Sequence, residues 1–136
     1  GKQEFIDKAR KVRKLLGGGL RQAGILAAAG IIALEQMVDR LAEDHAHARL
    51  LAAELANIPG LTIDPDAYPT NILICSVAKL GISAQRFSAL LAQHGVLANP
   101  ISATELRFVT HKDVTKNQII TAINIINQIV KAINQF

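Results

Sequence analysis

Basic residues and glycines gather in one stretch of the sequence, where they could together bind an anion. Three consecutive glycines at residues 17–19 have Lys11, Arg13 and Lys14 on one side and Arg21 on the other. Glycine reaches backbone conformations that are closed to other residues, and guanidinium and ammonium groups bind phosphates and carboxylates. The stretch therefore fits an anion-binding corner, and it also fits a helix-to-helix loop with solvated basic side chains.

A second candidate is Arg107, which lies inside a predicted strand at residues 105–110. By alternation, Leu106 and Phe108 lie on one face of this strand, and Arg107 lies on the other face with Glu105. A guanidinium on an inner face needs an anion, because an unpaired buried charge is costly. A bidentate carboxylate would satisfy it and would contribute about 1.5–3 kcal/mol. The alternative is a salt bridge to a local acid such as Glu105.

The remaining reactive side chains indicate no site. His45 and His47 are two positions apart on a predicted helix and point about 200° from each other, so they cannot bind one metal ion. We expect them and Asp44 to lie on a solvated helix face. Cys75 has no acid or histidine placed to activate it, which predicts a buried structural thiol. Residues 110–113 have the character of a loop with helix-capping groups. We therefore assign no catalytic residue and no metal site to this chain.

Composition narrows the class of protein. The chain has 136 residues, half of them apolar, and a formal net charge of +4. Six Lys or Arg side chains and two acids lie in residues 1–14, which form an amphipathic helical pattern, and no nucleic-acid motif accompanies them. A single cysteine excludes an internal disulfide and fits a reducing compartment, so a cytoplasmic location is expected. No apolar run is long enough to predict a membrane span.

The first 60 residues are predicted to be helical. The periodicity predicts a helix over residues 3–16 and a longer helical pattern over residues 20–56, which the Ile-Pro-Gly sequence at 58–60 ends. Residues 25–34 are apolar on nearly every face, and a helix of that kind is buried. This half therefore requires more protein to cover it, either a missing domain or a partner subunit.

The rest of the chain is predicted to form a small α/β domain, so that we divide the chain into domains at residues 1–60 and 61–136. From residue 70 the predicted order is β-α-β-β-α, a small sheet covered by helices. The strand at residues 70–77 is apolar on both faces and is expected to be central. A helix capped by Ser83 is followed by a short strand at 95–98, a turn at 99–100, the strand at 105–110 and a helix from about Thr115.

Several motifs closely resemble those of low-specificity L-threonine aldolases, which are pyridoxal-phosphate enzymes of the aspartate-aminotransferase-like fold. The most specific is the sequence RKLLGGGLRQAG at residues 13–24, and further matches follow in the same order. They are RLAEDH at 40–45, PTNI at 69–72 and LRFVTH at 106–111, with Asp113. The resemblance spans almost the whole chain, and it implies the C-terminal small domain of a fold-type I enzyme.

The resemblance also implies an activity. Enzymes of this family are lyases that cleave L-threonine or L-allo-threonine to glycine and acetaldehyde, and they form homodimers or homotetramers. By resemblance, Arg107 holds the substrate carboxylate, and Lys14 and Arg21 line the cofactor site. A related β-eliminating lyase that uses the same cofactor is the alternative activity, and a non-catalytic assembly or anion-binding domain is the alternative from another class.

Parts of the family's active site have no match in this sequence. The lysine that binds the cofactor lies upstream in the family, in a serine-lysine-glycine context that is absent here. The aspartate that pairs with the pyridine nitrogen and the histidine that stacks on the ring are also unmatched. Because the first residue is Gly1 and a helix begins almost at once, we expect a piece of a longer chain that lacks an N-terminal large domain. We expect these 136 residues to be inactive alone.

Overall fold

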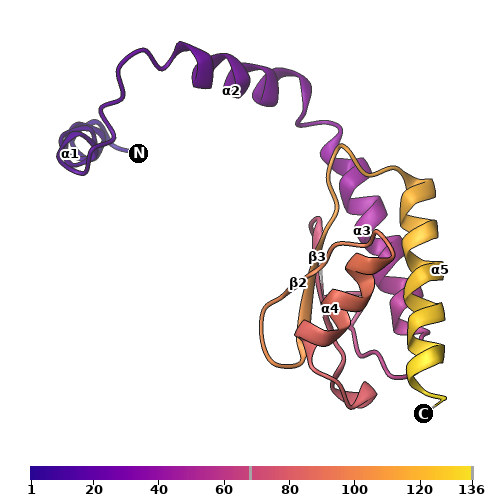
Figure 1. Ribbon diagram of the computed structural model, residues 1–136. Helices are drawn as coiled ribbons and strands as arrows, with labels where there is room; N and C mark the ends of the chain where they lie inside the picture. The colour runs from indigo at the N-terminus through magenta and orange to yellow at the C-terminus, as the bar shows by residue number, and fades with distance from the viewer. Residues whose placement is uncertain (68, 136) are drawn as a thin grey trace. The chain divides into compact units, whose positions relative to one another are not determined.

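The computed structural model describes residues 1–67 and 69–135, which form two compact units, Gly1–Val38 and Asp39–Phe136. Unit 1 contains helices α1 (Gln3–Leu15) and α2 (Gly24–Gln36), as Figure 1 shows. The helix expected over residues 3–16 is confirmed. No residue of either helix is buried, so unit 1 leaves its apolar side chains uncovered.

The long helical pattern expected over residues 20–56 is wrong as a single element. The structure divides it into α2 and α3 (Leu41–Ala56), and residues 37–40 turn between them. No glycine or proline marks this turn, so the residue types give no signal of it. The turn coincides with the change from a pattern that is apolar all round to a one-sided pattern, and α3 buries its apolar side in unit 2. The domain division expected at residue 60 stays a prediction.

Unit 2 contains a three-stranded antiparallel sheet. Its strands are β1 (Ile72–Ser76), β2 (Asn99–Pro100) and β3 (Glu105–Val109), in the order β1-β3-β2. The prediction that the first strand is central is wrong, because β3 takes that place and pairs with both others. The short strand expected at residues 95–98 is also displaced. The residues that pair with β3 are Asn99 and Pro100, for which a turn was predicted. Only the tertiary pairing distinguishes these positions.

Local capping signals were sufficient to place the starts of α4 and α5. The 3-10 helix η1 (Ala78–Leu80) ends at Gly81, whose φ is 68°. Helix α4 (Ala84–Gln93) begins where the Ser83 hydroxyl accepts a hydrogen bond from the Arg86 amide at 3.1 Å. Helix α5 (Lys116–Ile133) begins with the expected capping box between Thr115 and Gln118. The predicted starts of α4 and α5 are confirmed, because each depends on residues close together in sequence, whereas η1 was not predicted.

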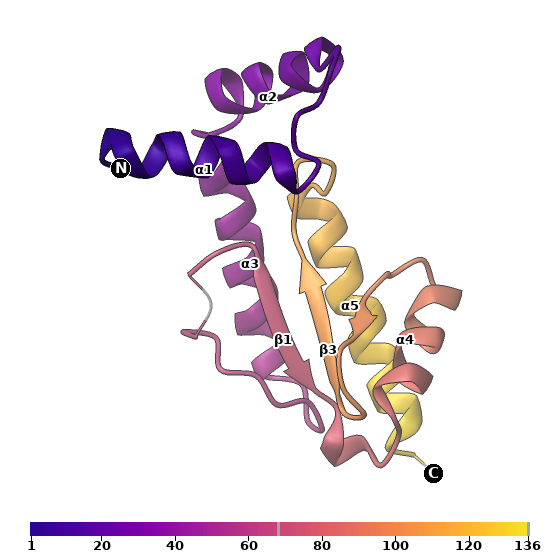
Figure 2. The same ribbon diagram turned by 90° about the vertical axis from the view of Figure 1, so that its left-hand side faces the viewer.

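The helices of unit 2 lie against one face of the sheet. Figure 2 shows α3 and α5 behind β1 and β3, with α4 beside them. Leu106 and Phe108 point into the core that this arrangement encloses, whereas Arg107 and Val109 are exposed on the opposite face. Among the described residues the sheet therefore has one covered and one open face. The largest fully buried side chains of the core are those of Phe87, Leu55, Leu73, Leu91, Leu106 and Ile126.

No helix in the part of the chain that the structure describes is both long and apolar enough to cross a membrane.

Candidate functional site

The glycine-rich stretch ends α1 in a tight cap. The Gly18 amide donates a 2.8 Å hydrogen bond to the Arg13 carbonyl, and the Gly17 amide donates a 3.2 Å bond to the Lys14 carbonyl. This pair of bonds, with a φ of 83° at Gly17, is a Schellman motif. A Cβ on Gly18 would lie only 2.7 Å from Cγ of Arg13. The positive φ therefore favours glycine at residue 17, and the Arg13 side chain leaves little room for a Cβ at residue 18.

The loop beyond the cap carries the residues predicted to bind the cofactor. Lys14 lies in the last turn of α1 and Arg21 in the loop, and both side chains are exposed. A Cβ on Gly19 would be 3.6 Å from Cγ of Lys14, so the loop passes beside the stem of that lysine. Neither cation forms an ion pair with a residue that the structure describes. Both therefore remain available to an anion within unit 1.

The backbone next to Arg21 has an unusual conformation that no sequence pattern predicted. Gln22 has a φ of 49°, and no other non-glycine residue in the described part of the chain has a positive φ. The left-handed region is unfavourable for residues with a Cβ, and such strain tends to occur at functional sites. A glutamine carries no sequence signal for this conformation, so only the structure reveals it.

Arg107 lies in the middle of the open face of the sheet. Its register partners are Ile74 on β1 and Asn99 on β2. The expected buried position on an inner face is wrong, because the helices cover only the opposite face of β3. The expected alternative, a salt bridge to Glu105, does not form; Ser102 instead donates to the Glu105 carboxylate at 3.0 Å. Arg107 forms no ion pair with any described residue.

The start of α3 contains a buried acid where a solvated face was expected. Asp44 is 3% exposed, and the Arg40 guanidinium donates two hydrogen bonds of 3.0 Å to its carboxylate. These bonds raise the pKa of Arg40 above its ordinary value. His47 is buried too, and its Nδ1 has no hydrogen-bond partner in the described chain. The prediction of a solvated face is wrong for both residues because α3 turns this side toward the interior of unit 2.

Asp44 belongs to a polar cluster that joins three segments distant in sequence. Thr110 donates its hydroxyl to the Asp44 backbone carbonyl at 2.6 Å. The Asn71 side-chain amide donates to the Thr110 carbonyl at 2.6 Å, and the Thr110 amide donates to the Asn71 carbonyl at 2.9 Å. The cluster fixes the end of β3, which is the strand that carries Arg107.

The other reactive residues have structural surroundings. Cys75 is 1% exposed, and burial raises the pKa of its thiol to about 11, so the expected buried structural thiol is confirmed. In the loop after β3, Lys112 pairs with Asp113 and holds the pKa of that carboxyl below its ordinary value. The described residues contain no group of three His, Cys, Asp or Glu side chains arranged to hold a metal ion.

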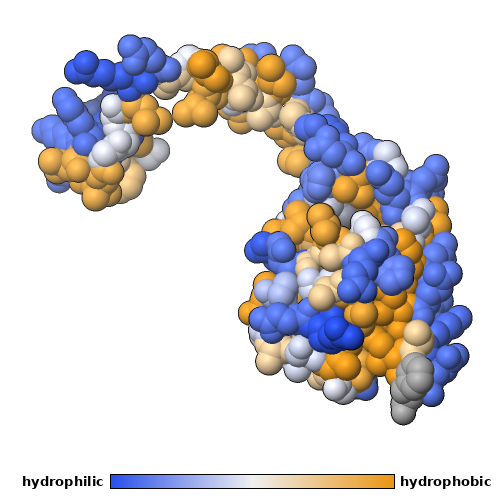
Figure 3. All heavy atoms as spheres, viewed as in Figure 1, coloured by the Kyte–Doolittle hydropathy of each residue, from blue (hydrophilic) through white to orange (hydrophobic). Residues whose placement is uncertain are grey.

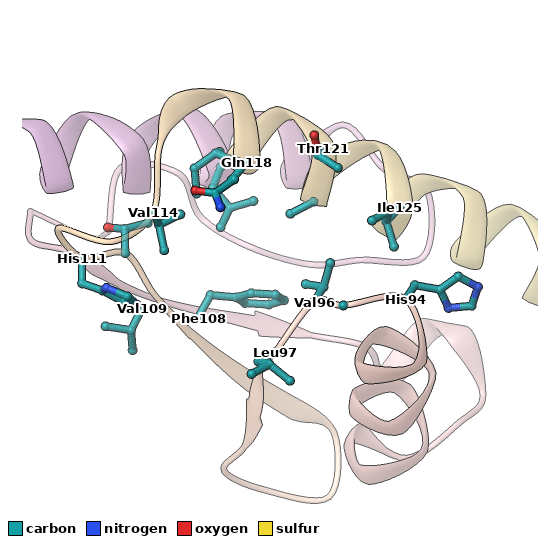
Figure 4. Close-up of a pocket in the computed structure, with 15 residues that line it drawn as sticks. His94, Val96, Leu97, Phe108, Val109, His111, Val114, Gln118, Thr121 and Ile125 are labelled. Carbon is teal, nitrogen blue, oxygen red and sulfur yellow. The ribbon is translucent and has the colours of Figure 1, made fainter.

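Unit 2 also contains a groove of about 400 Å³ between the end of β3, residues 94–97 and α5. Figure 4 shows Phe108 lying across it, with Val96 and Leu97 on one side and Gln118 and Thr121 on the other. Its lining residues include histidines but no lysine, arginine, aspartate or glutamate, and Arg107 is not among them. The groove thus offers no fixed charge to an amino acid, whereas the open sheet face offers the Arg107 guanidinium.

Comparison with known proteins identifies relatives along most of the chain. The model of the beta-eliminating lyase family matches residues 1–78. Low-specificity L-threonine aldolase 1 of Arabidopsis thaliana is 34% identical over 120 residues, which cover 88% of this chain and 34% of the relative. The low specificity L-threonine aldolase of Escherichia coli (strain K12) is 38% identical over 119 residues, with 88% and 34% covered. The chain spans about a third of the length of these relatives.

Solved structures share the fold. One from a study of transaminase evolution by ancestral reconstruction has a TM-score of 0.65 and 15% identity, covering 98% of this chain and 34% of that one. A structure of MppP soaked with 2-ketoarginine has a TM-score of 0.58 and 13% identity, covering 74% and 30%. The expected α/β fold of fold-type I pyridoxal-phosphate enzymes is confirmed.

Proposed function

Because this chain belongs to the beta-eliminating lyase family, we propose that it is the C-terminal part of a low-specificity L-threonine aldolase. The whole protein would cleave the Cα–Cβ bond of L-threonine or L-allo-threonine and release glycine and acetaldehyde. The named aldolases that match almost the entire chain support this activity. We further propose a cytoplasmic homodimer or homotetramer.

The observation that carries the proposal is the uncompensated charge of Arg107. Its guanidinium is exposed on the open face of the sheet, and no described acid pairs with it. A guanidinium presents donors in a planar fork that matches a carboxylate bidentately. Arg107 would therefore bind the substrate by the group that every α-amino acid carries. Amino acids with different substituents on Cβ could then bind without a change in this contact.

The unpaired cations of unit 1 fit the phosphate of pyridoxal phosphate. Lys14 and Arg21 lie on either side of the glycine turn, where a Cβ on Gly18 would meet the Arg13 side chain. We propose that these two side chains hold the phosphate group by charge-assisted hydrogen bonds. Pyridoxal phosphate supplies the electron sink for carbon–carbon cleavage when it is bound.

We propose that the chain needs the rest of the protein for turnover, because the cofactor-binding lysine context is absent from its sequence. The surface of α2 supports this interpretation. Ile25 is 87% exposed and Leu34 is 76% exposed, and Figure 3 shows apolar side chains along this helix. Apolar side chains gathered at this density are commonly covered by other protein. The large domain or a partner subunit would cover them.

The test compares threonine-dependent acetaldehyde release by the full-length protein and by this chain, both with added cofactor. We expect turnover only by the full-length protein. The substitution R107Q in that protein should raise KM for threonine about 10- to 150-fold, the loss expected for a charge-assisted contact. R49Q, at an exposed arginine of α3, is the matched control and should leave KM unchanged.

Each other outcome has a definite meaning. Enzyme-like turnover by the chain alone would overturn the proposed division of the active site. Ammonia and an oxo acid released from a β-substituted amino acid, without acetaldehyde from threonine, would favour a β-eliminating activity, in line with the name of the family. Absence of any turnover by the full-length protein would favour a non-catalytic domain.

A further inference from the structure

Two polar side chains are neighbours on the open face of the sheet. The register of β2 with β3 pairs Asn99 with Arg107 and Pro100 with Leu106. Directly opposite residues of an antiparallel pair project from the same face, with Cβ atoms about 4.5–5.5 Å apart. Leu106 is fully buried, so Asn99 and Arg107 both project from the other face, and both are exposed.

Within the described chain, neither side chain has a partner. No hydrogen bond of the Asn99 amide and no ion pair of the Arg107 guanidinium occurs there. The register partner of Arg107 on its other side is Ile74, whose side chain is apolar. Glu105, two residues along the strand, accepts a hydrogen bond from Ser102. Asn99 is therefore the polar register partner of Arg107.

The backbone around Asn99 is held on both sides. Before it, the Ser88 hydroxyl donates a 2.7 Å hydrogen bond to the Ala98 carbonyl. After it, the Ile101 amide donates a 2.9 Å bond to the Glu105 carbonyl, and the ring of Pro100 restricts its own φ. Although β2 has only two residues, its position on the sheet is thus determined. The backbone of Asn99 is therefore held beside Arg107 and does not belong to a free loop.

We propose that Asn99 and Arg107 form one carboxylate-binding site. The guanidinium binds the carboxylate bidentately, and Nδ2 of Asn99 donates a further hydrogen bond to one of its oxygens. A carboxylate can accept about four hydrogen bonds, so the three donors do not compete. An asparagine at this position adds a donor without neutralising Arg107, as an acid would. The inference rests on the proposed function for the identity of the ligand, an α-amino acid.

Kinetics of the full-length protein provide the first test. N99A should raise KM for threonine at least about 10-fold and leave kcat within about twofold, because one hydrogen bond to a charged group is lost in both ground and transition states. N99D should raise KM further, since the introduced carboxylate pairs with Arg107 and repels the substrate. N117A, at an exposed asparagine of α5, should change neither constant. An unchanged KM for N99A, or equal KM for N99A and N99D, would overturn the proposal.

A second test uses this chain and no catalysis. Sodium acetate is titrated into the ¹⁵N-labelled chain at constant ionic strength, with sodium chloride as the reference salt. The side-chain resonances of Asn99 and Arg107 should shift together with one dissociation constant, that of Asn117 should not shift, and R107Q should abolish the response of Asn99. Joint shifts with an inactive full-length protein would refute the proposed function and support the carboxylate site. An active protein whose Asn99 resonance does not respond would refute the site alone.

Discussion

Thr110 donates its hydroxyl to the backbone carbonyl of Asp44 at 2.6 Å, and this bond joins the end of β3 to the first turns of α3. Thr110 is 1% exposed and also exchanges backbone and side-chain hydrogen bonds with Asn71. Three segments that resemble the aldolases at separate places in the sequence therefore meet in one buried polar cluster. The cluster positions the strand that carries Arg107.

Removing the Thr110 hydroxyl should destabilise unit 2. T110V keeps the shape of the side chain but removes a donor from a buried site, which should lower the free energy of unfolding by about 1–3 kcal/mol. Urea unfolding followed by circular dichroism measures the change. T121V is the matched control, because Thr121 is exposed and its hydroxyl bonds only within α5. Equal effects of the two substitutions would show that the contact with Asp44 contributes nothing.

Removing the Arg40 guanidinium should be more damaging than removing an ordinary surface charge. The side chain of Asp44 is 4% exposed, and R40M would leave its carboxylate without either of the two 3.0 Å bonds. We expect the midpoint of urea unfolding to fall clearly for R40M, at the N-cap of α3, and to remain unchanged for R49M, at an exposed position within α3. A midpoint for R40M that matches R49M would contradict a structural role of the pair.

The cap of α1 should depend on glycine at residue 17. Its φ of 83° is unfavourable for a residue with a Cβ, so G17A should destabilise the last turn of α1 by about 1–2 kcal/mol. Faster amide hydrogen exchange in that turn would report the change. G30A is the control, since a Cβ there meets nothing within 4 Å and alanine favours a helix interior. Slower exchange in α2 is expected for G30A, and unchanged exchange for G17A would argue against the cap.

Cys75 should make the stability of the chain depend on alkaline pH. Its pKa of about 11 in the folded state exceeds the ordinary value of 9.0. The stability that the neutral buried thiol contributes is therefore complete below pH 9 and is lost as pH rises toward 11, because the unfolded chain releases this proton first. The free energy of unfolding of the unchanged chain and of C75A is measured by denaturant titration at each pH. It should fall more steeply with rising alkaline pH for the unchanged chain than for C75A. An equal dependence of the free energy of unfolding on pH for the two proteins would contradict the raised pKa of Cys75.

Local signals in the sequence were reliable. Ser83, Thr115 and Gln118 marked helix starts that the structure contains, because capping bonds join residues three positions apart. Alternation in residues 105–110 correctly separated the face of Leu106 from the face of Arg107. Alternation did not predict which of these two faces the helices would cover, because it separates the faces without assigning either of them to the core.

Long-range features were decided by tertiary structure alone. The central place of β3 and the burial of Asp44 depend on partners distant in the chain. The pairing of Asn99 with Arg107 is of the same kind, because a register shift of one residue would turn either side chain to the opposite face.

The amino-acid sequence was sufficient to predict the fold class, the family, the caps of α4 and α5, and Arg107, Lys14 and Arg21 as candidate binding residues. These features reside in residue types and short spacings, which the chain carries before it folds. Tertiary structure decided that Arg107 lies on the open face of the sheet with Asn99 beside it, and that Thr110 and Asp44 join two elements. Those relationships arise from packing and strand register, which bring together residues that no local pattern connects.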